Sequence, residues 1–112
     1  MNKKIAVPIE NGILTTHFGH AREFSLTTIE NNQILKEEIL VPPPHEPGVI
    51  PKWLGDIGAT DILAGGMGQQ AIQLFLNNNI SVYVGVEQKA PAQLVEDLIN
   101  DRLQSGGNYC TH

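Results

Sequence analysis

Two hydrophobic periods alternate along the chain, and each predicts one kind of element. Short apolar runs bounded by turn residues predict strands, and these runs cover residues 3–9, 24–29, 34–41, 61–64 and 80–86. Apolar residues spaced three and four apart predict amphipathic helices, with stripes within 50–57, 71–76 and 94–103. The predicted order is β-β-β-α-β-α-β-α.

Turn residues divide these elements and indicate how they connect. Asn31-Asn32-Gln33 predicts a hairpin between the second and third strands, and three prolines at 42–44 stop the third. The later alternation of strands and helices favours right-handed parallel crossovers. The sequence therefore predicts one α/β domain over residues 1–112, a mixed five-stranded sheet flanked by helices on both faces. This order matches the ribonuclease H-like topology.

Composition and charge narrow the class of protein. The chain has 112 residues, of which 41% are hydrophobic and 17% charged, so it is globular rather than disordered throughout. Its formal charge is -5 with no basic cluster beyond Lys3-Lys4, which disfavours nucleic acid and anionic membranes as partners. The first apolar run is too short for a signal peptide, and the single cysteine cannot form an intramolecular disulfide. We expect a soluble cytoplasmic protein.

Enzymatic arrangements find little support in the sequence. A two-metal nuclease needs clustered carboxylates on its central strands, but the first strand carries none, and we expect Asp56 and Asp61 to be a surface charge and a cap. A Cys–His nucleophilic pair would depend on Cys110, which follows the helix-breaking residues Ser105-Gly106-Gly107. Residues 105–112 are therefore predicted to form a flexible tail, which suits catalytic geometry poorly. We expect a binding protein and not an enzyme.

Glycines cluster at Gly65-Gly66-Met67-Gly68, between a predicted strand and a predicted helix. The free N–H groups of a first helical turn attract anions, and glycines let the backbone approach a ligand. The pattern is neither a P-loop nor a dinucleotide fingerprint. A tight turn whose glycines only relieve crowding explains it as well.

Histidine and cysteine side chains supply the candidate metal ligands. They are His17, His20, His45, Cys110 and His112. Their spacing fits neither a zinc ribbon nor a four-cysteine cluster site. One thiolate with one or two imidazoles suits the anchoring of a preassembled cluster better, with the tail closing over it as a clasp. Alternatively, the histidines are surface or loop residues and Cys110 is an idle thiol.

The segments HFGHA (17–21) and GATDILAGGMGQQAIQLF (58–75) resemble the dinitrogenase iron-molybdenum cofactor biosynthesis family, which includes NifX, NafY and the C-terminal region of NifB. The similarity covers nearly the whole chain. It implies a ribonuclease H-like fold and binding, without catalysis, of iron-molybdenum cofactor or its iron–sulfur precursor in transit. The cofactor-binding histidine of the family's HFG segment falls on His17. The preceding turn, ENGILTT, is short, and we expect the protein to stand alone, without the radical-enzyme and extra N-terminal domains of nitrogenase-dedicated members.

Together these observations predict a small carrier of an iron-molybdenum-type or iron–sulfur cluster, with cluster donor and acceptor proteins as partners and a monomeric or weakly dimeric state. The residues expected to hold the cofactor are His17, Phe18, Gly19, His20, Gly65, Gly66, Met67 and Gly68. His17 would make the first bond, and His20, beside a short helical turn at 21–24, would support the loop. The alternative is a metal-free adaptor or regulatory module that binds a protein or a small anionic ligand at the GGMG turn.

Overall fold

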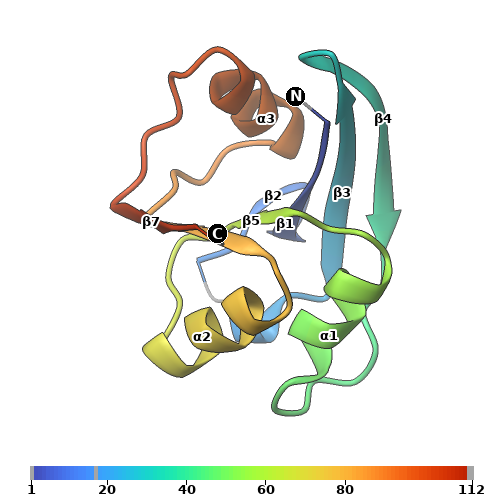
Figure 1. Ribbon diagram of the computed structural model, residues 1–112, viewed down its shortest axis with the longest axis vertical. Helices are drawn as coiled ribbons and strands as arrows, with labels where there is room; N and C mark the ends of the chain where they lie inside the picture. Colours follow the sequence, from blue (N-terminus) through green and yellow to red (C-terminus); the bar gives the residue numbers. More distant parts are fainter. Residues whose placement is uncertain (1, 17, 111–112) are drawn as a thin grey trace.

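A computed structural model describes residues 2–16 and 18–110, and the backbone alone of His20. This part of the chain forms a mixed sheet with three α-helices and one short 3-10 helix (Figure 1). The strands are β1 (Lys3–Glu10), β2 (Ile13–Leu14), β3 (Glu23–Glu30), β4 (Gln33–Leu40), β5 (Asp61–Leu63), β6 (Ser81–Val84) and β7 (Gly107–Tyr109). The helices are η1 (Phe18–His20), α1 (Val49–Asp56), α2 (Gln69–Asn77) and α3 (Pro91–Ile99).

The sheet runs in the order β4-β3-β1-β5-β6-β7, with β2 paired to β1. Strands β1, β3 and β4 are antiparallel neighbours, whereas β1, β5 and β6 are parallel. The β3–β4 hairpin turns at Asn31 and Asn32, which both have positive φ angles. The predicted mixed sheet is confirmed, and the ribonuclease H-like assignment stays a prediction.

The predicted number of five strands is wrong, because the described residues contain seven. Strand β2 forms a second hairpin with β1 through Asn11 and Gly12, whose φ angles are 54° and 84°. Two residues are too few to show an alternating period, although an Asn-Gly pair is itself a strong hairpin signal. Strand β7 pairs antiparallel with β6. It has the sequence GNY and so carries no apolar alternation.

Strand β7 lies within residues 105–112, which the sequence predicts to be a flexible tail. Its pairing begins where Gly106 N donates to Val84 O over 2.7 Å. A Cβ atom at Gly85 would lie 2.6 Å from Gly106 N, and Gly85 has a φ angle of +68°. Only glycine fits this position, so Gly85 makes the close approach of the returning chain possible.

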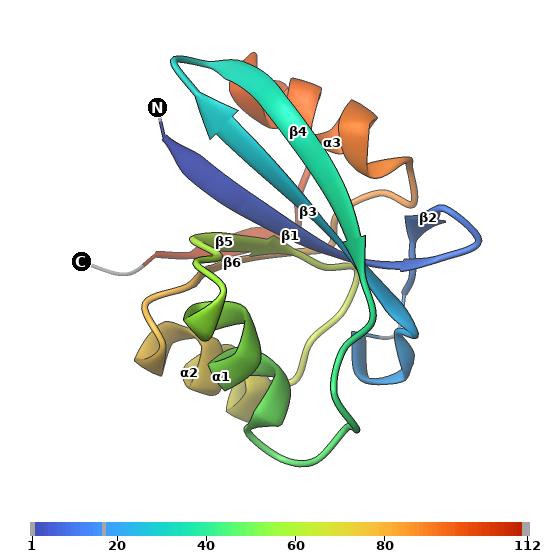
Figure 2. The same cartoon turned by 90° about the vertical axis from the view of Figure 1, so that its right-hand side faces the viewer.

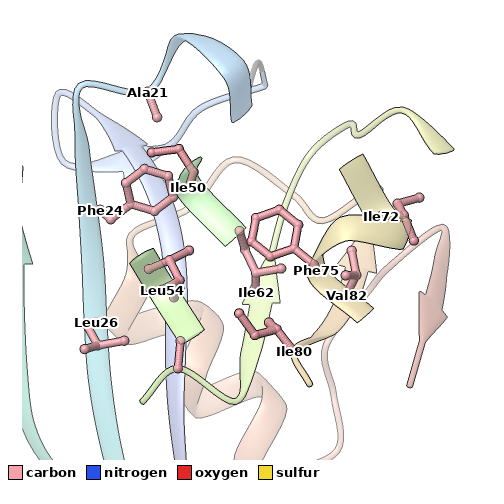
Figure 3. Packing of buried hydrophobic residues seen from close by; sticks show 12 residues of the cluster. Ala21, Phe24, Leu26, Ile50, Leu54, Ile62, Ile72, Phe75, Ile80 and Val82 are labelled. Carbon is pink, nitrogen blue, oxygen red and sulfur yellow. The ribbon is translucent and has the colours of Figure 1, made fainter. Parts of the chain in front are cut away.

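Helices cover both faces of the sheet, as predicted: α1 and α2 pack on one face and α3 on the other (Figure 2). The alternation of side chains along β1 separates the two cores, since Ala6 belongs to the first and Ile5 and Val7 to the second. The α1/α2 core is shown in Figure 3. Within the described ranges, no helix is long and apolar enough to cross a membrane.

Asp61 is not the cap that the sequence suggests, because it begins β5 and its side chain is only 2% exposed. Thr60 Oγ1 donates to its Oδ1 over 2.6 Å, and Lys3 Nζ lies 3.3 Å from its Oδ2. The pairing brings together residues that are far apart in the sequence, across the parallel strands β1 and β5. Asp56, in contrast, is an exposed partner of Lys52, as predicted.

Candidate functional site

The glycine turn and the segment that precedes His17 meet beyond the carboxyl end of β5, beside the last residues of β1, where Thr15 N donates to Pro8 O over 2.9 Å. A Cβ atom at Gly65 would lie 3.2 Å from the Cα of Thr16, and one at Gly66 would lie 3.7 Å from the Thr16 carbonyl oxygen. On its other side, Gly65 O accepts a hydrogen bond of 2.8 Å from Gly85 N. The parallel pairing of β1 and β5 therefore brings the two motifs of the predicted site together.

The glycines of the turn have different environments. Close packing against Thr16 accounts for Gly65, whereas a Cβ at Gly68 would meet nothing within 4 Å. Met67 is partly buried and packs against the α1/α2 core. Crowding thus explains one end of the turn, and the other end is open at the start of α2.

Phe18 fixes the HFG segment to the protein core. Its ring packs edge-on against Phe75, with centroids 5.4 Å apart, and against Phe24, with centroids 6.5 Å apart. The predicted helical turn over residues 21–24 is wrong: the turn is η1, Ala21 N donates to Phe18 O, and β3 begins at Glu23. The packing of the Phe18 ring and the burial of Ala21 fix the helical turn at residues 18–20, before the predicted position at 21–24. His17 and the side chain of His20 lie outside the described residues.

A cavity of about 360 Å³, here called the η1 pocket, opens beside this anchored segment. It is bounded by η1, the proline-rich loop before α1, and the first turns of α1 and α2. Its lining residues are Phe18, Gly19, His45, Glu46, Pro47, Gly48, Ile50, Pro51, Gln70, Ala71 and Leu74. The wall is mostly apolar, with His45, Glu46 and Gln70 as its polar side chains.

Two helices begin at the η1 pocket. Gly48, which has a φ angle of 82°, is the N-cap residue of α1, and Gly68 is the N-cap residue of α2. Neither helix has a side-chain cap or an acidic residue in its first turn. The first-turn amides of a helix lack partners within that helix, and the helix dipole is positive at this end. In α1, however, Val49 N already donates to Glu46 O, and Pro51 has no N–H group, so Ile50 supplies the remaining first-turn amide. The start of α2 is therefore the main feature that favours a negatively charged ligand, and the exposed carboxylate of Glu46 opposes one.

His45 is the described histidine side chain at this site. Its Nε2–H group donates to the Ala21 carbonyl oxygen over 2.9 Å, which leaves Nδ1 as the ring nitrogen outside this bond. The bond ties the proline-rich loop to the residue that follows η1. The structure thus brings His45 to the HFG segment, from a position 24 residues away in the sequence.

Cys110 lies at the other end of the sheet. Tyr109 pairs with Val82 and Gly107 with Val84, so Cys110, the next residue, lies near the start of β6. The glycine turn lies at the opposite end of β6, where Gly65 O accepts a hydrogen bond from Gly85 N. The thiol is exposed, with Asn108 Nδ2 3.9 Å from Sγ. The structure does not bring Cys110 to the glycine turn, and His112 lies outside the described residues.

The sequence alone does not indicate the residues that the two helices contribute to the pocket, above all Gly48, Gln70 and Ala71. Gly48 stands directly before a helical apolar stripe, which is a signal for a helix start. Nothing in the local sequence shows that this start lies beside that of α2. The convergence arises from the sheet order and from the packing of both helices on one face.

Comparison with known proteins identifies the family. Residues 1–101 match the family described as dinitrogenase iron-molybdenum cofactor. The chain belongs to this family. The resemblance carried by HFGHA and the GGMG turn is therefore confirmed.

The chain is also similar to individual proteins, in sequence or in fold. An uncharacterized protein of Methanocaldococcus jannaschii, MJ0580, is 33% identical over 85 residues, covering 71% of this chain and 72% of its own. The crystal structure of PH0822 has a TM-score of 0.84 and 29% identity, over 92% of this chain and 94% of that one. The apo form of the orange protein from Desulfovibrio gigas has a TM-score of 0.78 over 96% and 97%. At 22% identity, the latter shows a shared fold alone.

Proposed function

We infer that the protein binds a preassembled iron-molybdenum-type or iron–sulfur cluster as cargo and carries it without catalysis. Membership of the dinitrogenase iron-molybdenum cofactor family supports this function. The observation that carries the inference is the pocket beside the HFG segment, which the first turns of α1 and α2 line and where α2 begins without a side-chain cap or an acidic residue. An anionic cargo suits that position, although the protein itself has a formal charge of -5.

The donor set favours a cluster over a bare metal ion. The sequence has four histidines and one cysteine as candidate ligands, and among the described side chains, which do not include those of His17 and His20, no three His, Cys, Asp or Glu come together as a metal site. A bare ion needs a nearly complete set of protein ligands, whereas a cluster brings its own sulfide ligands. One or two protein bonds, together with backbone N–H groups, are then enough to anchor it.

His17 is the residue that we assign to the first bond with the cluster. Its sequence neighbours are both fixed, Thr16 against Gly65 and Phe18 in the aromatic core. We assign a supporting role to His20. The amides of Gly66, Gly68 and the first turn of α2 are assigned to stabilise the negative charge of the cluster.

The cargo role also suggests where the protein acts and with what. A carrier receives its cluster from one protein and passes it to another, so cluster donor and acceptor proteins are the proposed partners. A reducing compartment such as the cytoplasm protects both the cluster and the exposed thiol of Cys110.

Anaerobic reconstitution with iron, sulfide and molybdate tests the function. We expect a visible chromophore and a fixed metal content to co-elute with the protein, and His17→Ala to remove both. Glu46→Gln, which takes a negative charge from the pocket, should raise loading, whereas the matched control Glu96→Gln on α3 should not. A protein that stays colourless and metal-free would instead favour the metal-free adaptor or regulatory module.

A further inference from the structure

Strand β4 forms an open edge of the sheet (Figure 2). In the described part of the chain its one neighbour is β3, so its outer backbone groups have no strand partner. Large apolar side chains stand exposed along this edge: Leu35 is 56% exposed, Ile39 52%, and Val41, just after the strand, 77%. An exposed edge of this kind is a template for pairing with another strand.

The sequence of β4 is complementary to itself when two copies run antiparallel about Glu37. Lys36 then lies opposite Glu38 of the second copy, and Leu35 lies opposite Ile39. Both pairs occur twice, because the two-fold axis repeats them. Opposite charges and apolar pairs facing each other across antiparallel strands are stabilising.

Neighbouring registers lose this complementarity. Centring the pair on Lys36 places Leu35 opposite Glu37, and centring it on Glu38 places Ile39 opposite Glu37. Both shifts put carboxylates against apolar side chains. The order of charges in β4 thus selects one register and disfavours the others.

Three features of β4 act against pairing. Lys36 Nζ already lies 3.3 Å from Glu38 Oε1 of its own strand, so pairing of two copies exchanges this exposed ion pair for one between the copies. The other two features are accommodated in this register. Glu37 would face its own copy, but its Oε2 accepts a hydrogen bond of 2.8 Å from Ser25 Oγ on β3, which draws the carboxylate away from the outer edge. The β3–β4 register shifts between Thr28 and Ile29, and Leu35 is the extra residue. Pairing about Glu37 places residue 39 opposite this bulge in the second copy, so regular pairing covers residues 36–38 of each strand, with the Leu35 and Ile39 side chains at its margins.

We propose that two copies of this chain associate through β4, about a two-fold axis at Glu37, to form one continuous sheet. The contact is confined to one strand from each copy, so the dimer is weak and its population depends on concentration. This association is independent of the proposed cluster binding. The partner proposed for the β4 edge is a second copy of this chain, because the charges of β4 are complementary to those of its own antiparallel copy.

Charge reversal tests both the association and its register. Lys36→Glu places glutamates opposite each other in the homodimer, and Glu38→Lys places lysines opposite each other. We expect sedimentation velocity to show concentration-dependent dimers of the wild type and monomers of each single variant. An equimolar mixture of the two variants places every glutamate opposite a lysine, so a heterodimer should form at least about tenfold tighter than either homodimer.

The mixture separates association from local effects, because each variant in it carries the same changed side chain as it does alone. Lys52→Glu and Asp56→Lys, which reverse an exposed ion pair on α1, are the matched controls and should leave dimerisation unchanged. Circular dichroism checks that all variants are folded. A wild type that stays monomeric at millimolar concentration would overturn the proposal, and so would a variant mixture that shows no gain over its components.

Discussion

The backbone of Thr16 packs against Gly65, where a Cβ atom would come within 3.2 Å of the Thr16 Cα. Because this neighbour is backbone and cannot rotate away, Gly65→Ala must displace the segment that leads into His17 by a few tenths of an ångström. We expect a loss of about 1–3 kcal/mol in the free energy of unfolding, measured by urea titration, together with weaker cluster loading. Gly68→Ala is the control, since its Cβ would meet nothing within 4 Å. It should cost less than about 1 kcal/mol, and equal losses at both positions would contradict the packing argument.

His45 is expected to hold the pocket in shape through its bond to the Ala21 carbonyl. His45→Ala removes the donor and should lower unfolding free energy by about 1 kcal/mol, while loading after reconstitution falls several-fold. His45→Gln keeps an N–H donor on a side chain of similar reach and should recover part of the loading. If His45→Gln and His45→Ala are equally impaired, the imidazole contributes something other than this hydrogen bond, such as a bond to the metal.

The two histidines of HFGHA should differ in their effect on loading. We expect His17→Ala to abolish loading with almost no change in Tm, because the proposed ligand makes its bond only when cargo is present. His20→Ala should reduce affinity by ~10–100-fold, as for residues that orient a ligand, and lower the Tm slightly. Metal analysis after anaerobic gel filtration gives the ranking, and a stronger effect of His20→Ala at equal stability would reverse the assignment.

Cys110 lies at the opposite end of β6 from the glycine turn, so we expect Cys110→Ser to load cluster as well as the parent. This outcome would reject the clasp that the sequence alone suggests for the tail. The measurement is metal content and visible absorbance of both proteins, reconstituted side by side. Substantial loss of cluster from Cys110→Ser would show that the end of the chain reaches the site.

Tyr83 should make stability depend on pH in the alkaline range. Burial, with the nearby Asp61 carboxylate, raises the pKa of its phenol above the usual value near 10. The unfolded chain therefore releases this proton at a lower pH than the folded protein does. The stabilisation is complete below about pH 10 and is lost as pH rises through the folded pKa.

Urea unfolding of Tyr83→Phe and the wild type at pH 8 and pH 11 tests this dependence. The wild type should lose more unfolding free energy than Tyr83→Phe between the two pH values. Tyr109→Phe, at an exposed tyrosine, is the matched control and should behave like the wild type. Parallel losses in the wild type and Tyr83→Phe would show that the phenol does not carry the effect.

Local patterns predict the elements that are long enough to show a period. The apolar stripe containing Ile50 and Leu54 predicts α1, and Asn31-Asn32 predicts the β3–β4 turn, because both signals lie within a few residues. Strands β2 and β7 have two and three residues, too few for a period. Their pairing is decided by the strands beside them.

The candidate site likewise has some features that the local sequence predicts and others that it does not. The HFG segment and the glycine turn could be selected from residue types, because phosphate- and metal-binding chemistry uses few kinds of residue. The burial of Asp61 against Lys3, the reach of His45 to Ala21, and the meeting of two helix starts depend on contacts between distant segments. No local pattern encodes such contacts, so the pocket emerges only in the folded chain.

Trp53, the single tryptophan of the chain, lies on α1, whose first turn lines the pocket, and its ring meets that of Phe24 edge-on at 5.7 Å. An iron–sulfur chromophore absorbs across the near-ultraviolet and visible ranges, where indole emits. A bound cluster should therefore quench the fluorescence of Trp53 by energy transfer, and transfer of the cluster to an acceptor protein should restore that fluorescence. The position of Trp53 in the aromatic packing beside the HFG segment thus makes its intrinsic fluorescence a measure of how much of the unlabelled protein holds a cluster.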